Sequence, residues 1–196
     1  ADYDASVLNE VWQPMLTMLT KNNLNMTHEE LGLLETPVAL LKHIRPYHII
    51  ALAKNYEGLK ALYKLVSLSH IEYLEGVAKV PRKEIEKYRE NLILGSACFN
   101  GEVFRTARNY NMETLKEICS FYDYIEIQPL ENYSFLVNMD ELTQEDVVKY
   151  LQNIVEAAEA VGKPVCATGD VHYLTRNEKI FRDVFISAKG IGNTNH

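Results

Sequence analysis

The sequence predicts an α/β protein in which short buried strands alternate with helices, giving a parallel sheet that is either open or closed into a barrel. Two observations support this expectation. Apolar runs of strand length occur at residues 47–55, 91–98, 123–129 and 165–168. Between them lie stretches in which apolar side chains recur at helical spacing, which is the pattern of helices that pack on a sheet.

Near the start of the chain an amphipathic helix is expected, with apolar residues at three- and four-residue steps: Val7, Leu8, Val11, Trp12, Met15 and Leu16. Asp2 and Asp4 fall in its first turn, where the helix dipole favours acids. The weaker pattern of residues 20–45 predicts a connector with a short helix at 37–44, which Pro46 cannot continue.

The next units repeat a strand followed by a helix. Asn55 is a predicted N-cap, and the helix after it carries a stripe of Leu59, Leu62, Tyr63, Val66 and Ser69. A short charged helix is expected at residues 82–90. A later helix has its stripe at Leu115, Ile118, Cys119 and Tyr122.

The last two helices have predicted boundaries. Thr143 and Asp146 form a capping-box pattern, and Gly162 ends the helix that begins there. Asn177 is a predicted cap for a final helix, which bears Ile180, Phe181, Val184 and Ala188. Residues 190–196 are expected to form a loose, glycine-rich end.

Composition limits the possible classes of protein. The 196 residues are 47% apolar and carry a net charge of −7, with a pI near 5.4. No apolar run approaches the ~18 residues of a bilayer span, so no membrane partner is expected. The acidic balance argues against strong duplex binding by this chain alone. Three cysteines without metal-finger spacing suit reduced thiols, so we expect a soluble, cytoplasmic protein.

Candidate metal ligands follow two of the predicted strands. Asp170 and His172 share one side of an extended backbone after the fourth strand, and Cys98 closes the second. Carboxylate, imidazole and thiolate together suit zinc or, with more oxygen ligands, manganese or iron. His48 is a fourth candidate, although it lies early in its strand. The alternative is that Asp170 accepts from a turn amide and His172 only packs.

Other polar residues allow simpler interpretations. Glu126 lies in an apolar strand, where it either faces outward or is bonded near the site. Cys119 and Cys166 are expected to behave as small packing residues. The remaining histidines are expected on the surface: His28, His43, His70 and His196.

Four segments, in order, carry a resemblance to a known family: RPYHIIALAKN, NLILGSACFNGEVF, YDYIEIQPLENY and GKPVCATGDVHYL. Over residues 45–188 the chain resembles the second half of the polymerase and histidinol phosphatase (PHP) domain of PolC-type bacterial DNA polymerase III. In that family the PHP domain is a distorted seven-stranded β/α barrel interrupted by an exonuclease domain. The resemblance implies that residues 1–19 end the exonuclease, 20–45 connect, and 46–196 form the second half of the PHP domain.

The resemblance also implies roles for single residues. His48, Cys98, Asp170 and His172 fall on PHP metal-ligand positions, which suit zinc or manganese. The opening ADYDASVL resembles the end of the exonuclease pattern His-x-Ala-x-x-Asp, with Asp4 as its catalytic, metal-binding acid. Such a parent enzyme would act on DNA and deoxynucleotides with magnesium or manganese, beside other replisome subunits.

The family's earlier PHP ligands have no counterpart here, so we expect a fragment without polymerase or proofreading activity of its own. Two other functions stay open at this point. One is a stand-alone metal-dependent phosphoesterase of the PHP type. The other is a non-catalytic scaffold that contacts replisome domains.

Overall fold

The computed structural model describes residues 10, 12–14, 17, 44–138 and 142–189. The chain forms two compact units, Ala1–His43 and Ile44–His196. In the first unit, the described residues are helical, in line with the helix expected there. Asp4, the predicted connector up to His43 and the glycine-rich end at 190–196 lie outside the described residues.

The second unit contains all four predicted strands in shorter form: β1 (Ile50–Ala53), β2 (Leu92–Gly95), β3 (Ile125–Ile127) and β4 (Val165–Ala167). Between and after them come the α-helices α4 (Tyr56–Ile71), α5 (Arg82–Glu86), α6 (Glu102–Asn109), α7 (Met112–Phe121), α8 (Ser134–Asn138), α9 (Gln144–Ala160) and α10 (Lys179–Lys189). The described residues also form three short 3-10 helices: η1 (Arg89–Asn91), η2 (Leu130–Tyr133) and η3 (Arg176–Glu178). None of the described helices has the length and apolar content needed to span a bilayer.

The sheet pairing corrects one expectation. β3 and β4 are parallel, and a parallel bridge joins Gly95 to Tyr124, as predicted. β1 and β2, however, are antiparallel, with Ile50 opposite Gly95 and Ala53 opposite Leu92. The described part of the chain is therefore α/β, but its strands form two two-stranded sheets, an antiparallel β1–β2 pair and a parallel β3–β4 pair linked by the Gly95–Tyr124 bridge, rather than one all-parallel sheet.

The connection between β1 and β2 explains the antiparallel pair. A single helical crossover would return the chain to the end of the pair where β1 begins, and β2 would then run parallel to β1. Here the connection contains α4 and then a second segment with α5, which brings the chain back to the end of β1. The return ends beside the start of α4, where Lys54 N donates to the Asn91 carbonyl at 3.0 Å. β2 thus begins at the edge where β1 ends.

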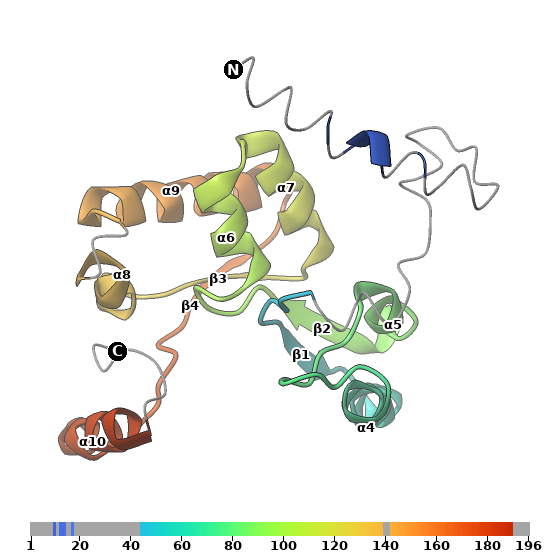
Figure 1. The fold of residues 1–196 in the computed structure, drawn as a ribbon, viewed down its shortest axis with the longest axis horizontal. Coiled ribbons are helices and arrows are strands. Elements are labelled where there is room, and N and C mark those ends of the chain that lie inside the picture. The colour runs from blue at the N-terminus through green and yellow to red at the C-terminus, as the bar shows by residue number, and fades with distance from the viewer. Residues whose placement is uncertain (1–9, 11, 15–16, 18–43, 139–141, 190–196) are drawn as a thin grey trace. The chain divides into compact units, whose positions relative to one another are not determined.

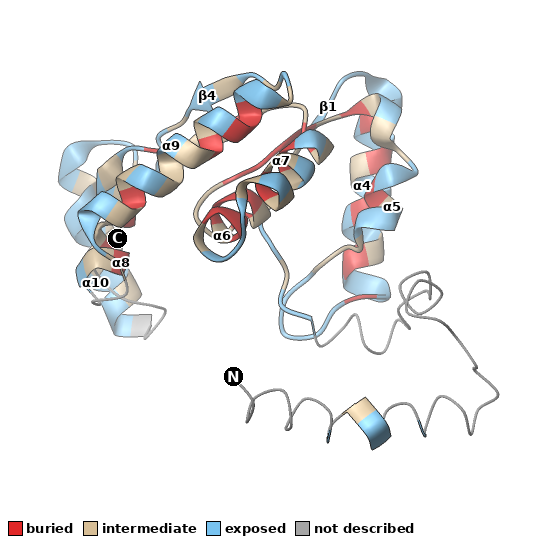
Figure 2. Ribbon diagram, turned by 90° about the horizontal axis from the view of Figure 1, so that it is seen from above, coloured by how far each residue is buried: buried red, intermediate tan, exposed pale blue. Residues whose placement is uncertain are grey.

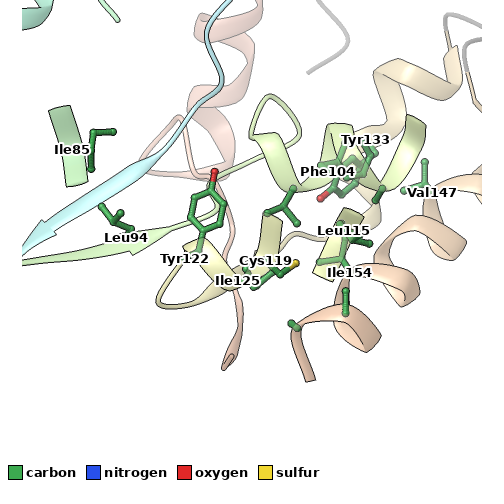
Figure 3. Packing of buried hydrophobic residues seen from close by; sticks show 14 of the residues in the cluster. Ile85, Leu94, Phe104, Leu115, Cys119, Tyr122, Ile125, Tyr133, Val147 and Ile154 are labelled. Atoms are coloured by element: carbon green, nitrogen blue, oxygen red, sulfur yellow. The ribbon is translucent and has the colours of Figure 1, made fainter. Parts of the chain in front are cut away.

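Helices α6, α7 and α9 lie together over β3 and β4 (Figure 1). The buried faces of α6 and α9 stand out in Figure 2, and they contribute to one hydrophobic cluster. Leu115 and Cys119 of α7 meet Ile154 of α9 near Ile125 of β3 (Figure 3). The rings of Phe104 and Tyr133 stack with centroids 4.8 Å apart. This core holds the three-helix layer against the sheet.

Most predicted helix boundaries are confirmed. Asn55 Oδ1 accepts a hydrogen bond from Gly58 N at 2.8 Å, and Thr143 and Asp146 form both bonds of a capping box. Gly162 adopts a φ of +69° at the end of α9. The predicted Asn177 cap is wrong, because Thr175 is the capping residue of η3, which runs directly into α10.

The buried face of α4 also differs from the predicted stripe. Ser69 is buried as expected, but Tyr63 and Val66 are 65% and 57% exposed. The helix instead buries Gly58, Ala61 and Leu65 together with Ser69. A Cβ on Gly58 would lie 2.2 Å from the Asn91 carbonyl oxygen, so the backbones approach too closely for a larger side chain there. Close approach, rather than side-chain size, selects this face.

Asp123 ties β2 to the start of β3, which leads to a stability prediction. Its Oδ2 accepts from Leu94 N at 2.7 Å and pairs with Arg89 Nη1 at 2.7 Å. Burial opposes ionisation, but the bonds from Arg89 and Leu94 outweigh it and lower the carboxyl pKa. This stabilisation is present above the unfolded pKa, about 3.9, and is lost as pH falls through the lower folded value.

Asp123→Asn is therefore expected to lower the free energy of unfolding at pH 7 by about 1–2 kcal/mol. The difference should shrink as pH falls below about 4, because the unfolded chain then binds a proton at this carboxyl more readily than the folded chain does. Urea titrations at pH 7 and pH 3.5 measure it. Glu57→Gln is the control, since the exposed Glu57–Lys60 pair should contribute little. An Asp123→Asn effect independent of pH would contradict the assignment.

Candidate metal centre

Two predicted ligands from opposite halves of the β1–β2 pair lie in contact. His48 Nδ1 is 3.4 Å from Cys98 Sγ. His48 precedes β1 and Cys98 follows β2, and the antiparallel pairing brings these positions to one edge of the sheet. The early position of His48 in its apolar run, which counted against it in the sequence, is thereby explained.

The turn after β2 fixes the backbone around this pair. Gly101 N donates to the Cys98 carbonyl at 2.7 Å, and His48 N donates to the Asn100 carbonyl at 3.1 Å. A Cβ on Gly101 would lie 2.1 Å from the Ser96 carbonyl oxygen and 2.9 Å from that of Cys98. The turn is therefore closed so tightly that only glycine fits at its end.

The other two predicted ligands follow β4. Both Asp170 and His172 are exposed. His172 Nδ1 lies 2.5 Å from the Asp170 carbonyl oxygen, a bond that requires the ring to donate there. Such a bond leaves Nε2 with its lone pair available, which is the usual tautomer of a metal-binding histidine. Asn132 Nδ2 donates to the Gly169 carbonyl at 3.0 Å and anchors this loop to η2.

Backbone strain coincides with the candidate ligands. In the described part of the chain, two non-glycine residues have a positive φ: Ala97 at 58° and Asp170 at 48°. One precedes Cys98 and the other is itself a candidate. This left-handed conformation is uncommon for residues other than glycine and tends to cluster at functional sites.

Glu126 lies between the two loops. Its side chain is half-buried and its Oε2 accepts from Thr168 Oγ1 at 2.9 Å. Its backbone N donates to Ser96 Oγ at 2.8 Å. Of the two alternatives that the sequence left open, the structure therefore has Glu126 bonded near the candidate ligands rather than facing outward.

The electrostatic environment of Cys98 links it to both acids. Burial is the largest cause that raises the pKa of the thiol, and the charges of Asp170 and Glu126 raise it further. A hydrogen bond from the backbone of Asn100 acts in the opposite direction. The thiol therefore favours its protonated form unless a cation offsets the nearby negative charge.

The donor set fits a metal in part. In a zinc tetrahedron, bond lengths of about 2.0–2.1 Å to nitrogen and 2.3 Å to sulfur separate the two donors by about 3.5 Å. The His48–Cys98 distance of 3.4 Å matches this separation. Within residues 44–138 and 142–189, however, no three His, Cys, Asp or Glu side chains converge closely enough to hold an ion.

The remaining cysteines and histidines differ in whether they are buried or exposed. Cys119 is fully buried in the core, as predicted. The packing role predicted for Cys166 is wrong, since this residue is exposed. Cys166 is the register partner of Glu126, so it lies on the polar face of β4, opposite the face toward α9. His70 is exposed as expected, while His28, His43 and His196 lie outside the described residues.

Sequence reasoning missed two hydroxyl residues, Ser96 and Thr168. Each precedes a candidate ligand by two positions, Cys98 in one loop and Asp170 in the other. A hydroxyl at the same offset in both strand ends was a signal available in the sequence. Its meaning depends on Glu126, which contacts both only in the folded chain.

Comparison with known proteins gives consistent relatives. The chain is 48% identical over 150 residues to DNA polymerase III PolC-type of Bacillus subtilis and 43% identical over 150 residues to that of Halalkalibacterium halodurans. For the protein of Clostridium perfringens the identity is 39% over 158 residues. These alignments cover 76–80% of this chain but only 10–11% of each relative.

A family model described as "PHP domain" matches residues 22–133, more than half of the chain. This match includes His48 and Cys98, which meet at the edge of the sheet. It is consistent with the homology to PolC-type DNA polymerase III, which was expected from the four ordered segments. The chain belongs to the PHP domain family.

Proposed function

We propose that this chain is part of a PolC-type DNA polymerase III and carries part of a metal-binding site of its PHP domain. The contact between His48 and Cys98 is the observation that supports the site most directly. Asp170 and His172 are proposed to complete this part of it, from the loop whose charge acts on Cys98. The strands would form part of a distorted β/α barrel.

Zinc or manganese is the proposed ion, and either would supply a Lewis acid for phosphoester chemistry or a structural crosslink. The protein's own residues orient the proposed ligands. The Asp170 carbonyl orients the His172 ring, and the turn that ends at Gly101 holds Cys98 against His48. Soft sulfur and imidazole donors favour zinc, while the carboxylate of Asp170 suits manganese as well.

For the whole protein we propose template-directed DNA synthesis with 3'-5' proofreading, on the basis of its PolC-type relatives. Its partners would be DNA, deoxynucleotides and other replisome subunits in the cytoplasm. Magnesium or manganese would serve the polymerase and the exonuclease, with Asp4 as one exonuclease acid. The 196-residue chain should neither extend a primer nor degrade a DNA 3' end; either activity in the purified chain would contradict this division.

Metal content tests the proposed site. Plasma mass spectrometry of the purified chain is expected to find about one zinc or manganese ion per molecule. Cys98→Ser and His48→Ala should lose most of it, because each removes one donor of the contacting pair. His172→Ala should also reduce the content by removing the donor that the Asp170 carbonyl orients.

Two matched variants serve as controls. Cys166→Ser makes the same change at an exposed thiol, and His70→Ala at an exposed histidine on α4. Both should keep the metal. Metal-free wild-type protein, or equal losses in Cys166→Ser and Cys98→Ser, would overturn the proposed site.

A further inference from the structure

Glu126 connects the two loops that carry the proposed ligands. Its backbone N–H donates a hydrogen bond to Ser96 Oγ, two residues before Cys98, at 2.8 Å. Its Oε2 accepts a hydrogen bond from Thr168 Oγ1, two residues before Asp170, at 2.9 Å. A single residue of β3 thus contacts the ends of both β2 and β4.

The second carboxylate oxygen has a different environment. Glu126 Oε1 is buried and has no hydrogen-bond partner in the described part of the chain. A buried, unpaired carboxylate oxygen costs free energy, so an apolar residue in β3 would serve the core better. The presence of a carboxylate here points to a role in the neighbouring site.

The surroundings of Glu126 show in which direction that charge acts. Burial is the first cause, and the charge of Glu126 the second, that raises the pKa of Tyr124 to about 12. Tyr124 in turn lies across Gly95, where a Cβ would be 2.2 Å from its ring. Glu126 therefore lies on the polar face of β3, next to the two loops that carry the candidate ligands.

We propose that Glu126 is a positioning residue of the metal site, which fixes the Cys98 and Asp170 loops relative to each other through Ser96 and Thr168. This inference rests on the proposed metal site and adds to it a residue that is not a ligand. Residues that orient metal ligands typically change metal affinity about 10–100-fold when they are replaced.

Cobalt(II) titration of the metal-free chain tests this, because a cobalt–thiolate bond gives a near-ultraviolet charge-transfer band that reports Cys98 coordination. The band should appear in the wild-type protein and be absent in Cys98→Ser. Glu126→Met keeps the length of the side chain but removes the carboxylate that accepts from Thr168, and should weaken cobalt affinity about 10-fold or more and alter the band.

The hydroxyl contact has its own matched pair. Thr168→Val removes the hydroxyl at nearly constant shape and should reproduce the Glu126→Met effect. Thr168→Ser retains the hydroxyl and should restore affinity and spectrum toward wild type. Glu84→Met makes the same change at a half-buried carboxylate of α5 that pairs with Lys87, and should leave the cobalt band unchanged.

The outcomes separate the two proposals. If the wild-type chain gives no Cys98-dependent band, the metal site itself fails and this inference fails with it. If the band is present but Glu126→Met and Thr168→Val bind cobalt like wild type, the metal site stands and the positioning role is overturned. A lower melting temperature without a change in affinity or band counts as the same negative result.

Discussion

Gly101→Ala is expected to destabilise the protein and to disturb the His48–Cys98 contact together. The added Cβ would lie 2.1 Å from the Ser96 carbonyl oxygen, a backbone atom that can move only if the turn after β2 opens. Overpacking of this kind costs about 1–3 kcal/mol. Opening the turn would also move the Asn100 carbonyl away from His48 N.

Urea unfolding and metal content measure the two parts of this prediction. Gly76→Ala is a useful control, because Gly76 has a φ of +70° with nothing within 4 Å of its would-be Cβ. It should cost about 1 kcal/mol through backbone conformation alone and leave metal content unchanged. Gly101→Ala protein with full stability and full metal content would show that the turn is more adaptable than its contacts indicate.

Leu115→Ala is expected to have the largest effect on stability alone. Leu115 is 2% exposed in α7 and belongs to the cluster with Ile154 of α9 and Ile125 of β3 (Figure 3). Its truncation should leave a cavity and lower the free energy of unfolding by about 2–5 kcal/mol. Denaturant titration monitored by circular dichroism measures the loss.

Leu174→Ala makes the same substitution at a side chain that is 90% exposed. It should change the unfolding free energy by less than about 0.5 kcal/mol. Similar losses in the two variants would contradict the assignment of Leu115 to the core.

The strands and helices of the second unit could be predicted because their signals are local. The capping box at Thr143 and Asp146 joins residues three apart, and Gly162 ends α9 through its own backbone conformation. Four apolar runs likewise marked the strands, each within a few residues of its true position. Periodicity and capping need no information from distant parts of the chain.

The predictions that failed depended on distant contacts. The apolar stripe of α4 was assigned from the helical spacing of its residues, but Gly58 faces inward because the Asn91 carbonyl approaches it. The Cys166 side chain was assigned to packing by its apolar neighbours, yet its register with Glu126 puts it on the polar face. Both outcomes depend on which segments of the chain become neighbours when it folds: the Asn91 backbone beside α4, and β3 beside β4.

The candidate ligands themselves, His48, Cys98, Asp170 and His172, were determined by the sequence as residue types placed near strand ends. Only the tertiary structure decided that β1 runs antiparallel to β2, which brings His48 to Cys98, and that Glu126 joins Ser96 to Thr168. The physical reason is that strand order and direction depend on the path of the connections and on contacts between residues 30–50 positions apart. Neither is encoded in local periodicity.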